Sequence, residues 1–258
     1  MTAVFVAAAS LLVLFVVLPL LSLVLGAGTS GIGEAFGDPD VRSSIVLTFT
    51  AALWATLLAL LTGVPLAFLL ARNDFPGKRW LEGIINLPIV VPHTAAGIAL
   101  LTVFSRNAAA GKALGSIGLD FTDATAGIVA GMLFVGLPFL VNGAKEAFAA
   151  IDPELERMAE VEGAKPWQVF VYVTMPLAWR GVTSGAVMMW GRGISEFGAV
   201  VIIAYHPKIV PVLVFERFSG FGLEAAIPVA VVLILVSLVV FVALRALVAG
   251  RRDRRLEV

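Results

Sequence analysis

The sequence contains no cysteine and only two histidines. Without cysteine, a disulfide framework and a thiolate metal site are both impossible. Charged residues make up 14% of the chain against 60% hydrophobic residues, and the mean hydropathy is +1.00. A chain this poor in charge is outside the range of water-soluble domains, so the composition indicates an integral membrane protein. The formal net charge is zero, so the total charge predicts no class of partner.

A phosphate-binding loop is also missing. The pattern G-x-x-x-x-G-K-[ST] does not occur, and the nearest glycine-rich segment, Gly26 to Gly33, lacks the lysine. We therefore expect that the chain does not hydrolyse ATP and has no cofactor of its own. A membrane-embedded enzyme would need a nucleophile with a base or a metal cluster, and two histidines, His93 and His206, give little support for either.

Six apolar runs are long enough to cross a hydrocarbon core of about 30 Å at about 1.5 Å per residue. Spanning segments of this kind are helices, because an open strand cannot satisfy its backbone in lipid. The sequence thus predicts an all-α membrane protein with six transmembrane helices and a single domain over residues 1–258. The first run is longer than the apolar part of a signal peptide and has no basic residues before it, so we expect a retained helix rather than a cleaved signal. The runs are Ala3–Leu25, Ser44–Ala71, Leu81–Phe104, Ala124–Asn142, Gly181–Tyr205 and Ala225–Val248.

Basic residues are unevenly shared between the loops that alternate along these runs. Because basic loop residues favour the cytoplasmic side, we expect both termini in the cytoplasm. The C-terminal run Arg251–Arg255 is interpreted as a topology anchor that also attracts anionic headgroups. Five basic residues fall on the other side: Arg42, Arg106, Lys112, Lys208 and Arg217. Twelve fall on the predicted cytoplasmic side: Arg72, Lys78, Arg79, Lys145, Arg157, Lys165, Arg180, Arg245, Arg251, Arg252, Arg254 and Arg255.

The predicted outer connections are short: Gly26–Ser43, Ser105–Asp123 and His206–Glu224. They are too small to form a soluble domain. We therefore expect a separate external protein to select the substrate.

The segment Ile151–Pro176 is a polar island between two apolar runs, on the predicted cytoplasmic side. Asp152 is a suitable N-cap, Pro153 suits the first helical position, and Gly163 supplies a helix stop. A second short helix is predicted over Trp167–Thr174. Leu155, Met158, Ala159 and Glu162 fall near one face, so the first helix carries a narrow apolar stripe with acidic flanks. Such a helix either docks into a groove of a partner or rests on the membrane surface.

The same segment resembles the cytoplasmic signature of permease subunits from binding-protein-dependent ABC importers. That signature reads Glu-Ala-Ala, three residues, Gly, nine residues, Ile, one residue, Leu-Pro. Here Gly163, Val173 and Met175-Pro176 stand at the family spacing, whereas the opening triplet reads Arg157-Met158-Ala159. The stretches Phe75–Leu101 and Arg192–Pro207 are similar to sulfate, molybdate and tungstate permeases, most closely to the archaeal molybdate/tungstate branch.

This resemblance implies the type I ABC importer permease fold and a role in oxyanion import across the plasma membrane. It implies a homodimer in the lipid bilayer, two cytoplasmic ATPases that carry ATP and Mg²⁺, and an external oxyanion-binding protein; no nucleic acid is expected. The coupling segment would cover residues 146–176. The expected ATPase contacts are Asp152, Pro153, Glu154, Leu155, Arg157, Met158, Ala159, Glu162, Gly163 and Lys165.

The fifth run carries two charged residues, Arg192 and Glu196, near its predicted middle. Each charge adds about 2.5 to 3.5 kcal/mol to the free energy of membrane insertion at the centre of a spanning helix. The i,i+4 spacing of the two residues places them on one face. They either line a pathway between two subunits, together with Ser195, or form a structural ion pair within one subunit. Glycines on the same run provide surfaces for helix packing or for a dimer contact: Gly185, Gly191, Gly193 and Gly198.

The third run contains Pro88 and Pro92, followed by His93 and Thr94. The prolines interrupt the backbone hydrogen bonds of a helix, so we expect a bent helix beside the pathway. His93 either contacts an oxyanion or completes a hydrogen bond between helices.

Two alternatives remain at this stage. A sulfate permease fits the resemblance as well, since the sequence does not rank the three tetrahedral oxyanions. An ion-coupled secondary transporter would explain the charged fifth run but leaves the polar island unexplained, and such proteins usually show internal repeats.

Overall fold

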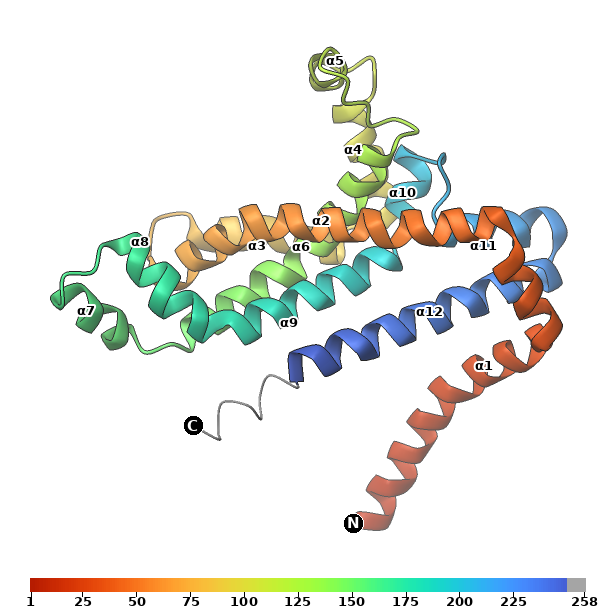
Figure 1. Ribbon diagram of the computed structural model, residues 1–258, viewed down its shortest axis with the longest axis horizontal. Coiled ribbons are helices and arrows are strands. Elements are labelled where there is room, and N and C mark those ends of the chain that lie inside the picture. Colours follow the sequence, from red (N-terminus) through yellow and green to blue (C-terminus); the bar gives the residue numbers. More distant parts are fainter. Residues whose placement is uncertain (250–258) are drawn as a thin grey trace. The chain divides into compact units, whose positions relative to one another are not determined.

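The computed structural model describes residues 1–249, except for the side chains of Ala3 and of residues 245–249, and in this range it has helices and no strands. The Arg251–Arg255 run lies outside the described residues. Figure 1 shows the helices in chain order. They are α1 (Thr2–Gly37), α2 (Pro39–Arg72), α3 (Lys78–Val90), α4 (His93–Phe104), α5 (Ala109–Gly115), α6 (Thr125–Ala149), α7 (Pro153–Val161), α8 (Pro166–Val169), the π-helix η1 (Phe170–Thr174), α9 (Met175–Ile194), α10 (Gly198–Ile203), α11 (Val210–Phe221) and α12 (Leu223–Ala249).

Within the described residues, four helices are long and apolar enough to cross a membrane, namely α1, α2, α6 and α12. The pair α3 and α4 makes a fifth span when it is counted as one broken helix. The all-helical membrane architecture is thus confirmed, while this count stays below the six predicted spans.

The first outer connection, Gly26–Ser43, was predicted as a link outside the spans, but it is largely helical. Helix α1 runs on to Gly37 with a kink at Gly28, where φ is +62° and ψ is 165°. Glycine is favoured at such a positive φ because it has no Cβ. Asp38 caps the next helix by accepting a hydrogen bond of 2.8 Å from the Asp40 N–H. Arg217 forms an ion pair with Asp38, and this hydrogen-bonded guanidinium lowers the pKa of the Asp38 carboxyl.

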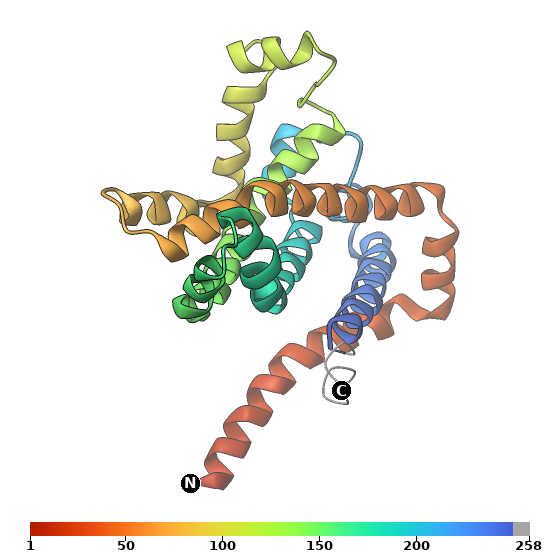
Figure 2. The same ribbon diagram turned by 60° about the vertical axis from the view of Figure 1, so that its left-hand side comes forward.

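The third run is broken rather than gently bent: α3 and α4 meet at 115°, a turn that is visible in Figure 2. The break lies at Val91 and Pro92, whose ψ angles are 130° and 131°. A residue that precedes proline disfavours the helical conformation, and proline itself has no N–H to donate. Pro88, by contrast, lies inside α3 and is buried.

The fifth run was predicted as one helix from Gly181 to Tyr205, and this was wrong. Helix α9 ends at Ile194, and a separate short helix, α10, begins at Gly198. The Glu196 side chain reaches forward and accepts a hydrogen bond of 2.8 Å from the Ala199 N–H, in the first turn of α10. A side chain that satisfies an early N–H in this way starts a new helix.

The second predicted cytoplasmic helix, Trp167–Thr174, does not stop before the next span. It begins at Pro166 as α8, widens into the π-helix η1 at Phe170, and continues into α9 at Met175. Pro176 follows the π-helix inside this continuous path, and its missing N–H removes one donor from the helical hydrogen bonds there.

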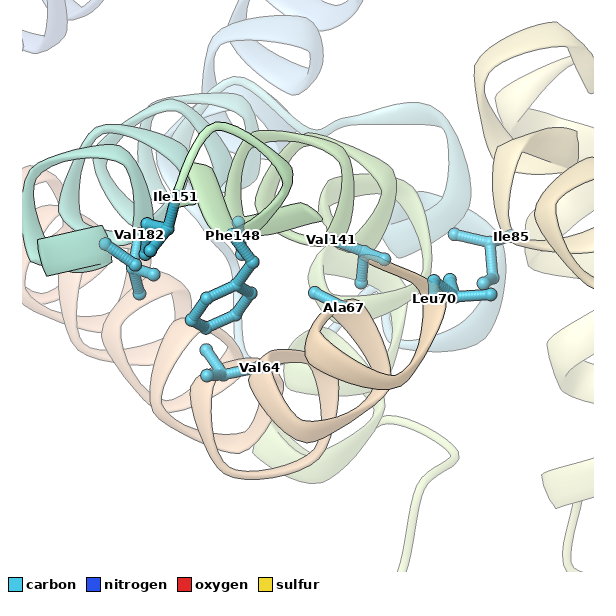
Figure 3. Close-up of a cluster of buried hydrophobic side chains, with 10 residues drawn as sticks. Val64, Ala67, Leu70, Ile85, Val141, Phe148, Ile151 and Val182 are labelled. Carbon is cyan, nitrogen blue, oxygen red and sulfur yellow. The ribbon is translucent and has the colours of Figure 1, made fainter. Parts of the chain in front are cut away.

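The described chain divides into two compact units. The first comprises Met1–Leu47 and Lys208–Val239, and its core includes Val41, Val210 and Val229. The second comprises Thr48–Pro207 and the chain from Val240 onward. Its core joins α2, α3, α6 and α9, as Figure 3 shows around Phe148.

The glycines of the fifth run pack inside the second unit. A Cβ on Gly185 would lie 3.2 Å from the Leu140 carbonyl oxygen of α6, and one on Gly193 would lie 3.3 Å from the Ala52 Cβ of α2. Gly191 has no such neighbour within 4 Å. Helix packing within one chain therefore explains Gly185 and Gly193, as small residues allow backbones to approach closely.

Candidate functional site

The polar island forms a well-capped exposed helix, α7. Asp152 caps it by accepting a hydrogen bond of 2.9 Å from the Glu154 N–H, and Pro153 occupies the first turn. Glu154 and Glu156 also lie in the first turn, where the helix dipole favours negative charge. Gly163 follows the helix with φ at +93°, so the predicted start and stop of this helix are both confirmed.

Helix α7 exposes apolar side chains. The exposed fractions are 45% for Leu155, 65% for Met158 and 86% for Val161, and the sequence pattern did not indicate Val161. Ala159 is half-buried, and the other members of the predicted contact set are exposed: Asp152, Pro153, Glu154, Arg157, Glu162, Gly163 and Lys165. The Lys165 N–H donates a 2.8 Å hydrogen bond to Gln168 Oε1, which fixes the turn into α8. The result is a short rigid helix with an exposed, partly apolar surface.

One acidic residue of α7 points inward. Glu156 pairs with Arg72, at the end of α2, with 2.8 Å between Oε1 and Nη2. The local sequence pattern does not indicate this ion pair, because the partner of Glu156 is 84 positions away in the chain. Near Arg72, in the turn after α2, Lys78 hydrogen-bonds to Asp74 and lowers the pKa of that exposed carboxyl.

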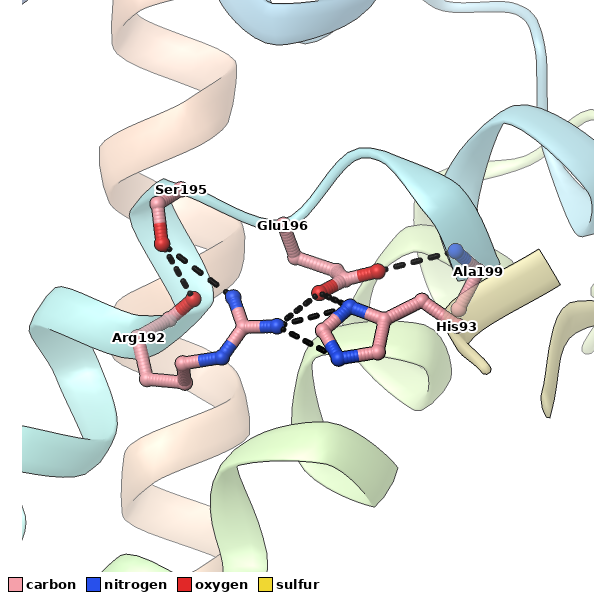
Figure 4. Close-up of polar contacts among 5 residues, drawn as sticks. All are labelled: His93, Arg192, Ser195, Glu196 and Ala199. Atoms are coloured by element: carbon pink, nitrogen blue, oxygen red, sulfur yellow. Dashed lines mark hydrogen bonds and ion pairs between the residues drawn. The ribbon is translucent and has the colours of Figure 1, made fainter. Parts of the chain in front are cut away.

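A second polar cluster joins the two breaks in the third and fifth runs (Figure 4). Glu196, which has no exposed surface, places Oε2 2.8 Å from Arg192 Nη2 and 2.9 Å from His93 Nδ1. Arg192 Nη2 also lies 2.7 Å and 3.0 Å from the two ring nitrogens of His93. Arg192 Nη1 donates to Ser195 Oγ at 3.1 Å. We call His93, Arg192, Ser195 and Glu196 the break cluster.

The break cluster is balanced in charge. With a neutral imidazole, it holds one guanidinium and one carboxylate in direct contact, and the other Glu196 oxygen is satisfied by the Ala199 N–H. A fully buried carboxylate is tolerated when it is paired and hydrogen-bonded in this way. Arg192 is therefore already neutralised within its own chain.

The remaining residues of the predicted pathway set surround the same break. Pro92 precedes α4 and is exposed, as is Thr94 in its first turn, whereas Pro88 is buried in α3. Gly198 makes the close approach possible, since a Cβ there would lie 2.7 Å from the His93 Cβ.

Two further polar contacts link α3 to α6. Asn142 Nδ2 donates to Asn86 Oδ1 at 2.6 Å, and Lys145 Nζ lies 2.9 Å from Glu82 Oε1. These contacts were not predicted, because nothing in the local pattern indicates which residues of two different runs meet.

Within residues 1–249, no group of three or more histidine, aspartate and glutamate side chains is placed to hold a metal ion.

Comparison with known proteins places this geometry in a family. Residues 63–253 match the family described as "Binding-protein-dependent transport system inner membrane component". A molybdate/tungstate transport system permease protein of Thermococcus kodakarensis is 43% identical over 216 residues, which cover 84% of this chain and 82% of that protein. The protein with the same description from Pyrococcus abyssi is 39% identical over 251 residues, 96% of each chain.

A solved structure supports the fold. The crystal structure of a bacterial alginate ABC transporter in complex with an alginate pentasaccharide-bound periplasmic protein contains a chain that matches with a TM-score of 0.75 at 18% identity. The match covers 98% of this chain and 93% of that one. The family match and the two relatives together decide the assignment: the chain belongs to the inner membrane components of binding-protein-dependent transport systems.

Proposed function

We propose that this chain is the permease subunit of an ATP-driven importer that brings molybdate or tungstate into the cytoplasm. As a family member with several membrane-crossing helices, it is a multi-pass protein of the plasma membrane. The observation that carries the proposal is the exposed, capped helix α7, which follows the membrane-crossing helix α6 and lies in the segment that resembles the family signature. The names of its relatives point to molybdate and tungstate as the cargo.

In the proposed assembly, two copies of the chain form the pathway, two ATPase subunits bind and hydrolyse ATP with Mg²⁺, and an external protein delivers the oxyanion. Helix α7 is the contact to the ATPase. Its exposed Leu155, Met158 and Val161 supply the apolar area that a groove would cover. A helix resting on the membrane would use the same residues, so the partner has to be tested directly.

The test uses the absence of native cysteine. Met158→Cys is expected to crosslink to a cysteine in the ATPase groove after the complex has been purified, and copurification of the ATPase is the first readout. Ile117→Cys, which is 76% exposed in a predicted outer connection, is the control and should not crosslink. Failure of crosslinks from Leu155, Met158 and Ala159 alike would contradict the docking proposal.

We also propose six spans with both termini in the cytoplasm. The six are α1, α2, the broken pair α3–α4, α6, the broken pair α9–α10, and α12. Glu160→Cys in α7 should then react with a membrane-impermeant maleimide only in inverted vesicles, and Ile117→Cys only from outside. The opposite labelling pattern would reverse the orientation.

The pathway is proposed to run beside the break cluster, with Pro88, Pro92, His93, Thr94, Arg192, Ser195 and Glu196 as its gate or lining. Because Glu196 already neutralises Arg192, the geometry favours a gate locked by ion pairing over an open cation site. Arg192→Leu should abolish uptake while ATP hydrolysis can still be induced by the loaded binding protein. Arg192→Lys, which keeps the charge but loses the second contact to Ser195, should retain part of the uptake; full uptake in Arg192→Leu would remove the gate role.

The cargo is tested in the reconstituted complex of two permeases, two ATPases and the binding protein. Uptake of labelled molybdate should be suppressed by tungstate and much less by sulfate. Calorimetric titration of the binding protein with the three oxyanions shows where the selection occurs. Preferential sulfate uptake would instead support a sulfate permease, the function named for a relative that is 34% identical.

A further inference from the structure

Three separate elements meet at the inward face of α7. Glu156 Oε1, in the first turn of α7, lies 2.8 Å from Arg72 Nη2 and 3.2 Å from Arg72 Nε, at the last residue of α2. The same oxygen accepts a 2.7 Å hydrogen bond from Thr174 Oγ1, in the π-helix before α9. The Arg72 and Glu156 side chains are only 13% and 14% exposed, and Thr174 is fully buried. We call Arg72, Glu156 and Thr174 the α7 joint.

Arg72 also holds the chain just before α7. Its Nη2 donates to the Ile151 carbonyl oxygen at 3.3 Å, one residue before the cap at Asp152. Ile151 is itself buried in the core of the second unit. One guanidinium therefore fixes both the first turn of α7 and the turn that enters it.

A layer of aromatic rings lies one helical turn away from the joint. Phe68, four residues before Arg72, packs edge-on against Phe170, four residues before Thr174, with 5.0 Å between the ring centroids. Phe68 packs in the same way against Phe148, near the end of α6, at 5.5 Å. Since i and i+4 share a helix face, the apolar and the polar layers are formed by the same faces of α2 and η1. Packed aromatics below the ion pair keep these two helices at a fixed separation.

The other charged side chains of α7 do not take part. Within Pro153–Val161, Glu154, Arg157 and Glu160 are exposed, and Glu156 is the charged residue that is not. Helix α7 thus has two different faces. Exposed apolar side chains lie on the outward face, and the Glu156 carboxylate lies on the inward face. Without that carboxylate, α7 would keep its packing against α8 and η1 and its flanking non-helical residues, 150–152 and 162–165, but it would lose its ion pair with α2.

From this arrangement we infer that Glu156 is a positioning residue that ties the coupling helix to α2 and to the π-helix leading into α9. The inference rests on the proposed function of α7. A displacement of α7 would otherwise be absorbed by rotation in its flanking turns; through the joint it reaches α2 and α9 directly. The π-helix at the joint is consistent with such a role, because single-turn π-helices within α-helices are frequent at functional sites.

The test measures how tightly ATP hydrolysis is linked to uptake in the reconstituted complex with its ATPases and binding protein. Glu156→Gln should lower the oxyanion taken up per ATP hydrolysed by about tenfold, the scale of one lost charge-assisted hydrogen bond, while stimulated hydrolysis persists. Glu160→Gln, an equally conservative change at an exposed position of the same helix, is the matched control and should leave the ratio unchanged.

A double-substitution cycle separates the joint from a general loss of stability. Arg72→Gln and Glu156→Gln should each lower the ratio, and the double variant should be no worse than either alone, because the same contact is lost in all three. Additive losses would overturn the inference. Thr174→Val removes one donor without changing charge, so it should give a smaller decrease even if Glu156→Gln does not fold.

The crosslink from Met158→Cys to the ATPase distinguishes this inference from the function on which it rests. If the crosslink forms in the Glu156→Gln background and the uptake per ATP is unchanged, the joint has no role in coupling. If the crosslink fails in the otherwise unaltered chain, the docking proposal itself is wrong.

Discussion

Two carboxylates of the second unit each contact an arginine at 2.8 Å, yet their surroundings differ. Glu196 has no exposed surface and lies where two helices are interrupted, while the Glu156 side chain keeps 14% exposure at the edge of the bundle. The Glu196 carboxylate also accepts a hydrogen bond from a backbone N–H of α10, whereas the Glu156 carboxylate accepts hydrogen bonds only from side chains. Similar ion pairs therefore have different roles: Glu196 stabilises a local helix start, and Glu156 the attachment of an already formed helix.

The largest expected effect comes from removing the charge of Glu196. Glu196→Gln leaves Arg192 without its carboxylate in a buried setting, so the free energy of unfolding in mixed micelles should fall by about 3 kcal/mol. Combining it with Arg192→Gln should recover part of this loss, because the uncompensated charge is then gone. Glu82→Gln is the control, since the Glu82–Lys145 pair is about 30% exposed and should lose less than about 1 kcal/mol. If Glu196→Gln and Glu82→Gln lower the free energy of unfolding equally, the buried ion pair contributes no more to stability than the accessible one.

A smaller effect is expected where the helices of the break cluster approach each other. Gly198→Ala would place a Cβ 2.7 Å from the His93 Cβ, so it should lower the free energy of unfolding by about 1–3 kcal/mol and reduce uptake. Gly191→Ala, with nothing within 4 Å of the added atom, should be neutral or slightly stabilising in helix α9. The measurement is the free energy of unfolding of the two variants under the same conditions. If Gly198→Ala leaves that free energy unchanged, the starts of α4 and α10 are loosely packed.

The smallest effect belongs to the exposed end of α7. Asp152→Ala removes the cap on the Glu154 N–H, which is worth about 1 kcal/mol of local helix stability. Hydrogen exchange should therefore speed up at Glu154 and Leu155, while Asp152→Asn, which can still cap, should change little. Unaltered exchange in Asp152→Ala would indicate that the α7 joint alone sets the stability of the first turn.

Local chemistry was enough to predict where helix α7 starts and stops. The cap at Asp152, the proline after it and the stop at Gly163 each depend on near neighbours in the chain, and all three are present in the structure. The spacing of Arg192 and Glu196 likewise brought them together, although they lie across the end of a helix rather than within one. Such features follow from the periodicity of the helix itself.

What the sequence did not predict depends on contacts between distant residues. His93 meets Arg192 across 99 positions, and Arg72 meets Glu156 across 84. The interruption after Ile194 was missed because apolar residues resume directly after Glu196, so the two helices were taken as one long run. At this interruption Glu196 accepts from the Ala199 N–H at the start of α10, and the i,i+4 spacing of Arg192 and Glu196 gives no indication of that bond.

The coincidence of the two interruptions has a mechanical consequence. Helices α4 and α10 start beside each other at His93 and Gly198 and continue in contact, with Gly97 against Ala199 and Ile202. If α4 and α10 rotate as one rigid body, the pivot is at His93 and Gly198, where both helices start. Phe104, at the other end of α4, is then about 18 Å from the pivot, at about 1.5 Å per residue. A swing of about 10° would then carry Phe104 by about 3 Å while His93 stays almost still. A fluorophore attached at Phe104 should thus register an opening event that a probe near His93 does not.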